Sequence, residues 1–215
     1  MGVAALTAVV GTVITFAGAY LVEKSRTAAA GVLYMLALLP VAVPGMVLGL
    51  AYIFVFNAAG SVLNRLYGTL AILVISNLIH YFTVPFLTAT TSLKQMDAEF
   101  ENVSVSLGVP FYRTFWRVTV PIALPSIVGI SMYFFLNAMV TLSAVVFLVA
   151  PGTELAAVAV LLLDDAGESA QATAMSVLII GIGLLARLVY WALLRGVTRR
   201  TQAWTTATQE PTSTA

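Results

Sequence analysis

Long runs of apolar residues are the feature that most restricts how this chain can fold. Five such runs lie at roughly 3–22, 29–56, 69–90, 124–149 and 172–194. Because a helix rises 1.5 Å per residue, runs of about 20 residues cross a hydrocarbon core about 30 Å thick. The runs do not alternate apolar and polar residues with a period of two, which excludes the strands of a membrane barrel. The sequence therefore predicts an all-α, polytopic membrane protein with about five transmembrane helices.

The scarcity of charged residues supports this fold class. Only 9% of the residues are charged, whereas a soluble domain carries about a quarter. The first positive residue is Lys24, so the first run lacks the basic segment of a cleavable signal peptide and is interpreted as a retained span. We expect one transmembrane domain over residues 1–200 and a disordered polar tail at 201–215. Residues 155–163 are too few to span and favour a re-entrant or interfacial piece on the outer side.

Basic residues concentrate in alternate connections between the predicted spans. Nine of the ten lie after the first span, between the third and fourth, or around the end of the fifth: Lys24, Arg26, Lys94, Arg113, Arg117, Arg187, Arg195, Arg199 and Arg200. The other two connections, 57–68 and 150–171, carry a single basic residue, Arg65. By the positive-inside rule, the N-terminus faces out and the C-terminus faces the cytoplasm. An odd number of spans agrees with this orientation.

Several kinds of chemistry are excluded by what the sequence lacks. There is no cysteine and the single histidine is His80, which leaves no disulfide framework and no multi-histidine metal centre. A phosphate-binding loop needs the pattern G-x-x-x-x-G-K-[ST], yet neither lysine, Lys24 or Lys94, follows a glycine. We therefore expect no cofactor on this chain, and any ATP hydrolysis must take place in a partner.

The cytoplasmic connection at 93–121 begins with the features of a short helix. Asp97 suits a helix N-cap, and Glu99 and Glu101 lie where negative charge stabilises a helix N-terminus. Gly108 suits the position after this helix, where the chain needs a left-handed turn. Pro110 fits the first turn of a second helix, where its missing N–H has no partner anyway.

The second helix of this connection is aromatic and basic. Phe111, Phe115 and Trp116 share one side of it until Pro121 interrupts the helix, and Arg113 and Arg117 lie among them. The pattern predicts a helix–turn–helix elbow outside the bilayer. Aromatic and arginine side chains are typical anchors of protein interfaces. The alternative is an aromatic belt at the lipid headgroups, with Arg113 and Arg117 pairing with phosphates.

The spacing within this elbow resembles the EAA loop of ABC importer permeases. In that loop a glycine is followed, after nine residues, by I-x-L-P, and here Gly108 is followed at the same distance by Val118-Thr119-Val120-Pro121. Asn102-Val103-Ser104 stands where Glu-Ala-Ala is usual. The stretch LPVAVPGMVLGLAYIF resembles the proline-broken helix of the same permeases, and the order of spans matches with one N-terminal helix fewer. The overall likeness is greatest to the 2-aminoethylphosphonate type, related to the ferric-iron importers.

This resemblance implies a transport subunit of the bacterial plasma membrane rather than an enzyme. Its loop would dock on a cytoplasmic ATPase. Its spans would form a solute pathway with a second permease subunit, in a homo- or heterodimer, and a periplasmic or extracellular substrate-binding protein would supply the solute. The implied solute is 2-aminoethylphosphonate or a related phosphonate; iron(III) or another small anion is the alternative, and no nucleic acid is involved. The ATPase-coupling residues carried over are Glu99, Glu101, Asn102, Gly108, Pro110, Phe111, Arg113, Phe115, Trp116, Arg117 and Pro121.

Polar and helix-breaking residues within the spans mark a candidate pathway or hinge. Pro40, Pro44 and Gly45 interrupt the second run, and the backbone groups that they free need protein partners or a water-lined cavity. Either a hinge or a static kink is consistent with them. Asn77 and His80 share one face of the third run, and Asn137 lies in the fourth. Each either lines a pathway or forms an interhelical hydrogen bond.

Two other classes of function are weaker interpretations. Gly129-Ile130-Ser131-Met132 has the form G-x-S-x of a membrane serine protease, with His80 on another span, but one short pattern does not account for the elbow. The second class is a membrane scaffold protein without transport function. Association with an ATPase would distinguish a transporter subunit from both.

Overall fold

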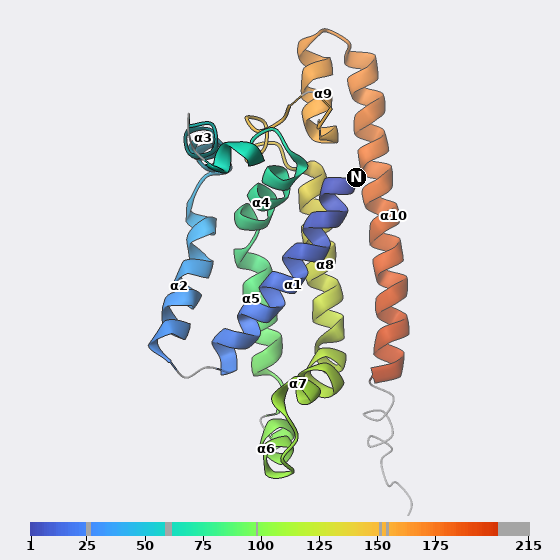
Figure 1. The fold of residues 1–215 in the computed structure, drawn as a ribbon. Helices are drawn as coiled ribbons and strands as arrows, with labels where there is room; N and C mark the ends of the chain where they lie inside the picture. Colours follow the sequence, from blue (N-terminus) through green and yellow to red (C-terminus); the bar gives the residue numbers. More distant parts are fainter. Residues whose placement is uncertain (25–26, 59–61, 98, 151, 154, 202–215) are drawn as a thin grey trace, which may run out of the picture.

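The computed structural model describes residues 1–24, 27–58, 62–97, 99–150, 152–153 and 155–201 (Figure 1). Within these residues every regular element is a helix and none is a strand, which confirms the all-α fold class. Three helices are long and apolar enough to cross a membrane, and two bent helix pairs raise that number to five if each pair is one span. The tail predicted at 201–215 lies outside the described residues except for Thr201.

Helix α1 (Gly2–Lys24) lies in the centre of the bundle because one of its faces consists of small residues. Small residues let helix backbones approach closely within a membrane. This face packs against α8 (Val120–Val140) and α5 (Thr83–Lys94). A methyl group on Gly11 would lie 2.9 Å from two ring carbons of the fully buried Phe134 on α8. The buried small residues of α1 are Ala4, Thr7, Ala8, Gly11, Thr12, Thr15 and Ala19.

The predicted span at 29–56 is two helices, α2 (Ala28–Ala42) and α3 (Gly45–Phe56), with a bend of 107° between them. The break follows from Pro44, since the residue before a proline avoids helical dihedrals and Val43 is extended. Pro40, by contrast, lies inside α2 without ending it. The run therefore does not continue as one straight helix, and α3 crosses the end of the bundle (Figure 1).

The predicted span at 69–90 is also divided, into α4 (Leu70–His80) and α5, with a bend of 58°. Pro85 is the third residue of α5, where its missing N–H costs no hydrogen bond. In a continuous helix its ring would meet the carbonyl of Tyr81, four residues earlier, and the chain breaks at that point.

The predicted span at 124–149 has different limits, because α8 begins at Val120 and ends at Val140. Thr141 is extended, and residues 143–148 form turns. Val145 and Leu148 of these turns are buried against Ile72 and Leu73 of α4. The 3₁₀ helix η1 (Val62–Leu66) precedes α4 at the same end. The short apolar segment predicted at 155–163 is α9 (Ala156–Asp165), which packs against α10 and α8.

Helix α10 (Ser169–Thr201) lies at the side of the bundle and contacts α8 and α9 (Figure 1). None of the residues in its most apolar segment is buried within the chain. Its exposed side chains are aliphatic over most of its length, as expected of a helix surrounded by lipid tails. They include Val177, Leu178, Ile180, Leu184, Leu185, Leu188 and Val189.

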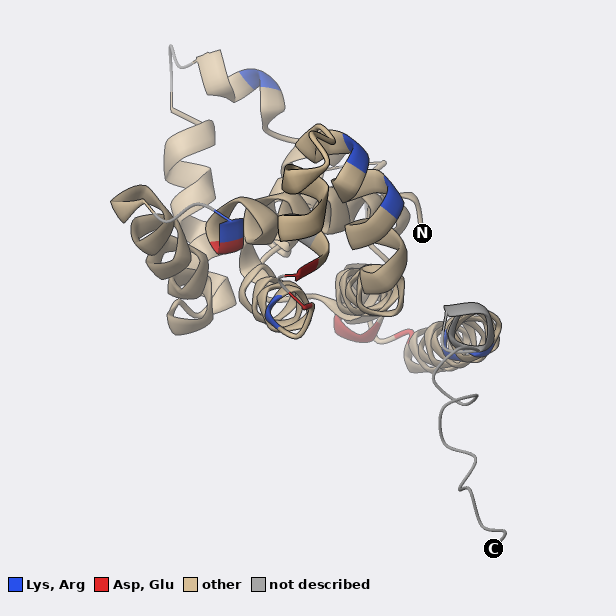
Figure 2. Cartoon of the chain, turned by 90° about the horizontal axis from the view of Figure 1, so that it is seen from below, with Lys and Arg blue, Asp and Glu red and all other residues tan. Residues whose placement is uncertain are grey.

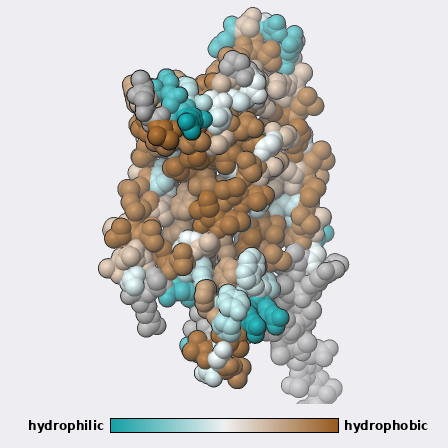
Figure 3. All heavy atoms as spheres, in the orientation of Figure 1, coloured by the Kyte–Doolittle hydropathy of each residue, from teal (hydrophilic) through white to brown (hydrophobic). Residues whose placement is uncertain are grey.

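The two ends of the bundle differ in the charged residues that they carry. The ends of α1, α5 and α10 and the segment after α5 lie together at one end, which Figure 2 views directly with lysine and arginine in blue. Here Lys94 Nζ lies 4.0 Å from Glu23 Oε2. The turn between α9 and α10, with Asp164 and Asp165, lies at the opposite end. Between the ends, the face seen in Figure 3 is mostly hydrophobic.

Candidate functional site

The elbow, residues 97–121, begins with a capped helix as the sequence predicts. Asp97 Oδ1 accepts a hydrogen bond from the N–H of Glu99 at 2.9 Å, and this opens α6 (Glu99–Ser106). Asn102 is exposed on α6, while the side chain of Glu101 lies outside the described part of the chain. The acidic first turn therefore forms, with its N-cap, beyond the end of α5 (Figure 1).

Gly108 closes α6 with a Schellman turn. The N–H of Gly108 donates to the carbonyl of Val105 at 3.0 Å, and the N–H of Val109 donates to Ser104 at 2.9 Å. The φ of Gly108 is +66°, in the left-handed region that glycine adopts without a Cβ penalty. No atom lies within 4 Å of where a Cβ would be, so the requirement for glycine comes from the backbone alone.

The second helix of the elbow continues without a break into α8, so the interruption predicted at Pro121 does not occur. Pro110 is the N-cap rather than a first-turn residue of α7 (Phe111–Thr114). A π-helical turn, η2 (Phe115–Thr119), then joins α7 to α8. Its wider hydrogen bond, from the N–H of Val120 to the carbonyl of Phe115, makes room before the proline ring. One helical unit of 30 residues, Phe111–Val140, therefore links the elbow to the bundle.

The sequence predicts that the aromatic rings of the elbow share one side of the helix, and the structure shows that they do not. Phe115 turns inward and meets two rings of α1: its centroid lies 4.7 Å from Tyr20 and 6.1 Å from Phe16. Phe111 and Trp116 turn outward and are 74% and 66% exposed. The sequence placed Phe115 with the docking residues, but its contacts are those of an anchor. It ties the start of the 30-residue helix to the central helix α1.

The outward residues form what we call the elbow surface. Leu107, at the end of α6, is exposed beside the Gly108 turn, and Tyr112 is half-exposed beside Phe111. Two arginines and three aromatic rings thus lie at the basic end of the molecule. The members of the elbow surface are Leu107, Phe111, Tyr112, Arg113, Trp116 and Arg117, all exposed. Such a set of rings and guanidinium groups is typical of a protein interface.

A second candidate site lies where three helix breaks meet. A methyl group on Gly45, at the start of α3, would lie 2.9 Å from His80 Cε1 and closer still to Ser143 Oγ. The ring of His80 stands edge-on to Tyr81, with centroids 4.6 Å apart. The Tyr81 hydroxyl and Thr141 Oγ1 are hydrogen-bonded at 3.0 Å. We call Gly45, His80, Tyr81, Thr141 and Ser143 the break cluster.

Gly45 and Gly49, four residues apart on α3, each lie close to another part of the chain: Gly45 to Ser143 and to His80 at the end of α4, and Gly49 to the turns after α8. A methyl group on Gly49 would lie 3.1 Å from the carbonyl oxygen of Ala144, in the turns that follow α8. The same carbonyl accepts a hydrogen bond from Ser76 Oγ of α4 at 3.0 Å. Gly49 therefore lets α3 lie directly on the backbone that leads away from α8.

The remaining predicted pathway residues are divided between different environments. Asn77 is fully buried, and neither polar atom of its side chain has a hydrogen-bond partner among the described residues, so the interhelical bond considered for it is not formed. Asn137 Nδ2 donates to the carbonyl of Tyr133 within its own helix at 2.8 Å. Pro44 is exposed as the N-cap of α3.

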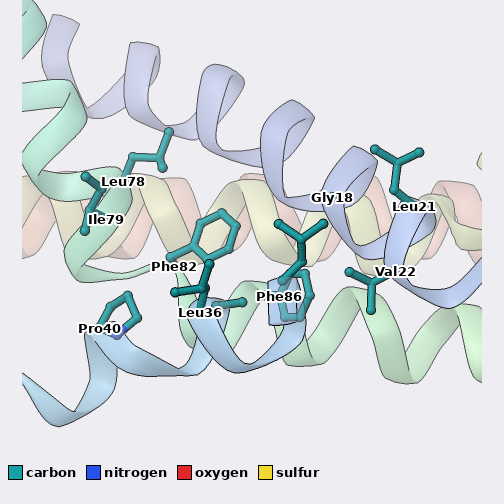
Figure 4. A pocket seen from close by; sticks show the side chains of 11 residues that line it. Gly18, Leu21, Val22, Leu36, Pro40, Leu78, Ile79, Phe82 and Phe86 are labelled. Carbon is teal, nitrogen blue, oxygen red and sulfur yellow. The ribbon is translucent and has the colours of Figure 1, made fainter. Parts of the chain in front are cut away.

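Pro40 lines an apolar cavity of about 320 Å³ between α1, α2 and the α4–α5 pair (Figure 4). Phe82, Phe86 and Leu36 point into the same space. Its lining is almost wholly hydrocarbon, which suits an apolar occupant and offers little to a hydrophilic solute. Pro40 also lines a second, more polar cavity beside His80 and Tyr81.

Tyr81, Thr141 and Ser143 are members of the break cluster that sequence reasoning did not identify. Each is a hydroxyl-bearing residue within or beside an apolar run, and this alone is a weak signal. Hydroxyl groups are tolerated in membrane helices because they can hydrogen-bond to the backbone. What distinguishes these three is that the helix breaks bring them together.

Comparison with known proteins gives three informative relatives, although no family model matches the chain. The ferric transport system permease protein FbpB of Actinobacillus pleuropneumoniae is 32% identical over 199 residues, 92% of this chain and 28% of that protein. The putative 2-aminoethylphosphonate transport system permease protein PhnV of Salmonella paratyphi A is 31% identical over 154 residues, 71% of this chain and 57% of that protein. The putative ferric transport system permease-like protein AfuB of Escherichia coli is 31% identical over 110 residues, 51% of this chain and 92% of that protein.

These relatives agree on the class of protein and differ in the solute that they name. The chain spans about a quarter of the length of the first and just over half of the second. The first two are named as permease proteins of transport systems and the third as permease-like, and the third is covered almost completely. The apolar, membrane-length helices agree with a multi-pass protein of the inner membrane. From these matches and its helical architecture, the chain belongs to the permease family of binding-protein-dependent ABC transport systems.

Proposed function

We propose that this chain forms part of the membrane pathway of an ATP-driven importer and couples to a separate ATPase subunit through the elbow. The chain itself acts as a transport subunit and has no catalytic role. ATP hydrolysis takes place in the partner, in keeping with the absence of a phosphate-loop lysine from the sequence.

The observation that carries this proposal is the division of the elbow into an outward surface and an inward anchor. Phe111 and Trp116 are exposed at the basic end, whereas Phe115 contacts Tyr20 and Phe16 of α1. A partner that moves the elbow surface therefore moves the start of a continuous 30-residue helix and, through Phe115, the central helix. This gives the ATPase a direct mechanical connection to the bundle.

The proposed solute is ferric iron or 2-aminoethylphosphonate, the solutes named for the relatives. The preference for a phosphonate in the sequence interpretation stays a prediction, because relatives of both kinds match the chain. The proposed assembly contains this chain, a second permease subunit, ATPase subunits in the cytoplasm and a substrate-binding protein on the outer side. The basic end, which carries the elbow, then faces the cytoplasm, as the positive-inside rule requires.

Co-purification of the ATPase with tagged variants tests the coupling surface. Trp116→Ala should reduce the ATPase recovered with the chain by about tenfold or more, since truncation of an interface anchor typically costs 2 kcal/mol or more. Trp191→Ala is the matched control: Trp191 is also exposed, at 52%, but it lies on α10 near the same end, where Arg195 stacks on its ring. This variant should retain the ATPase.

Equal recovery of the ATPase with both variants would reject the elbow as the docking surface. Uptake of iron(III) and of 2-aminoethylphosphonate by cells carrying the complete transport system then identifies the solute. Failure of the wild-type chain to bring down any ATPase would reject the importer assignment itself and favour a scaffold.

A further inference from the structure

The exposed face of α5 differs in composition from the other exposed faces of the bundle. Val84, Thr88, Thr91 and Gln95 follow one another at intervals of three or four residues and are all exposed, so they form one stripe along the helix. The opposite face of α5, with Phe86, Ala89 and Leu93, is buried in the bundle. Polar side chains therefore lie on the face of α5 that the rest of this chain leaves open.

A second polar stripe lies on α8, opposite the first. Ser126, Tyr133 and Asn137 are separated by seven and four residues and so occupy one face of α8. Ser126 lines a groove of about 450 Å³ together with Thr88, Thr91, Ser92 and Gln95 of α5. Helices α5 and α8 are in direct contact, and Ser126 is where the second stripe borders the groove.

This groove continues into the cavity beside the break cluster. The second cavity, of about 220 Å³, is lined by His80, Tyr81 and Tyr133, and Val84 belongs to the lining of both. The two hollows therefore adjoin along α5. Together they extend from Gln95, near the basic end, to the level at which α2, α4 and α8 are broken.

This face is more polar than a surface that contacts only lipid tails usually is. Thr88 Oγ1 donates to the carbonyl of Val84 at 2.9 Å, but the side chains of Thr91, Gln95 and Ser126 form no hydrogen bond with the described residues. In hydrocarbon, each unpaired polar group costs about 1–3 kcal/mol or more, so polar residues within spans usually face a protein neighbour or a water-filled cavity. The exposed side chains of α10, by contrast, are aliphatic from Val177 to Leu185.

Resting on the function proposed above, we propose that the groove between α5 and α8 is this chain's wall of the solute pathway. Thr88, Thr91, Gln95 and Ser126 line the groove, Tyr133 lines the adjoining cavity, and the break cluster forms the inner end. The residues that line the groove and the adjoining cavity include no Asp, Glu, Lys or Arg. The pathway therefore holds a small hydrophilic solute by exchangeable hydrogen bonds to hydroxyl, amide and phenol groups rather than by ion pairs.

The absence of cysteine from the sequence makes this proposal directly testable. Thr88→Cys and Ser126→Cys would be introduced singly, and open membrane fragments carrying the assembled complex would be treated with a charged, hydrophilic methanethiosulfonate reagent. The matched control is Val189→Cys on α10: Val189 is 57% exposed and lies six residues from Arg195, just as Thr88 lies six residues from Lys94. Only a thiol in contact with water ionises and reacts quickly.

Both groove cysteines should react at least about tenfold faster than the cysteine at position 189, because their thiols ionise in water. Modification at position 88 should also block solute uptake, whereas exposure of the position-189 variant to the reagent should leave uptake unchanged. Equal and slow labelling at all three positions, in a complex that retains its ATPase and its uptake, would overturn the groove as the pathway but leave the proposed function intact. Loss of the ATPase from the unmodified wild-type complex would instead overturn the function.

Discussion

The elbow and the break cluster are built in opposite ways. The elbow turns most of its large side chains outward, and its shape depends on residues close together in sequence: Asp97 caps α6 and Gly108 ends it. The break cluster turns polar side chains inward, and it joins residues distant in sequence, as in the hydrogen bond between Tyr81 and Thr141, 60 positions apart. One region is local in origin and open, and the other is long-range in origin and enclosed.

Under the proposed function, this difference lets the two regions serve one transport cycle. An exposed surface can bind and release a partner without opening the packed interior of the bundle. Helix ends that meet inside the bundle can change their packing when the helices on which they lie are moved, because such ends are held by a few side-chain contacts. Phe115 and the helix Phe111–Val140 connect the two regions, since the far end of that helix leads directly into Thr141.

The strongest test of the enclosed region is Gly45→Val. The added side chain would collide with Ser143 Oγ and with the ring of His80, and overpacking of this kind costs about 1–3 kcal/mol. Heating of the purified protein, followed by size-exclusion chromatography, should show a lowered midpoint of unfolding. Gly31→Val is the control, because no atom lies within 4 Å of its Cβ position. A midpoint unchanged from wild type in the Gly45 variant would mean that the cluster is loosely packed.

The local origin of the elbow is tested by Gly108→Ala. A residue with a Cβ at φ +66° is strained, which costs about 1–2 kcal/mol. The elbow should lose its closed turn, and recovery of the ATPase with the chain should fall. Gly167→Ala provides a matched control, since Gly167 ends α9 with a Schellman turn of the same hydrogen-bond pattern, at φ +81° and with no atom within 4 Å.

Both alanine variants should therefore lose similar conformational stability, while only the variant at position 108 loses the ATPase. Limited proteolysis at each turn measures the first quantity, and co-purification measures the second. Loss of the ATPase in both variants would show that the effect is general destabilisation and that the elbow has no special part in docking.

The smallest expected effect is that of Tyr81→Phe. It removes the hydroxyl that bonds Thr141 Oγ1 at 3.0 Å, and a neutral hydrogen bond of this kind contributes about 1 kcal/mol. Tyr133→Phe is the control, because the Tyr133 hydroxyl forms no hydrogen bond with the described residues. A double-mutant cycle of Tyr81→Phe with Thr141→Val should show coupling in thermal unfolding; additive effects would contradict the pairing.

Sequence reasoning succeeded where the signal is local. The apolar runs predicted an all-α membrane protein, Asp97 and Gly108 predicted the start and end of α6, and Pro44 predicted a break. It was wrong at Pro121, where a π-helical turn carries the helix through, and it placed Phe115 on the docking side. Periodicity alone does not reveal on which side another helix lies, and α1 decides the direction in which Phe115 must point.

The sequence by itself determined that the chain resides in a membrane, because so many apolar residues with so few charges cannot form a water-soluble surface. It also determined the turn at Gly108, since backbone conformation there depends on that residue's missing Cβ. Only the tertiary structure decided which polar groups meet. Tyr81 lies 60 residues before Thr141, and the two come together because helices end at one level of the bundle.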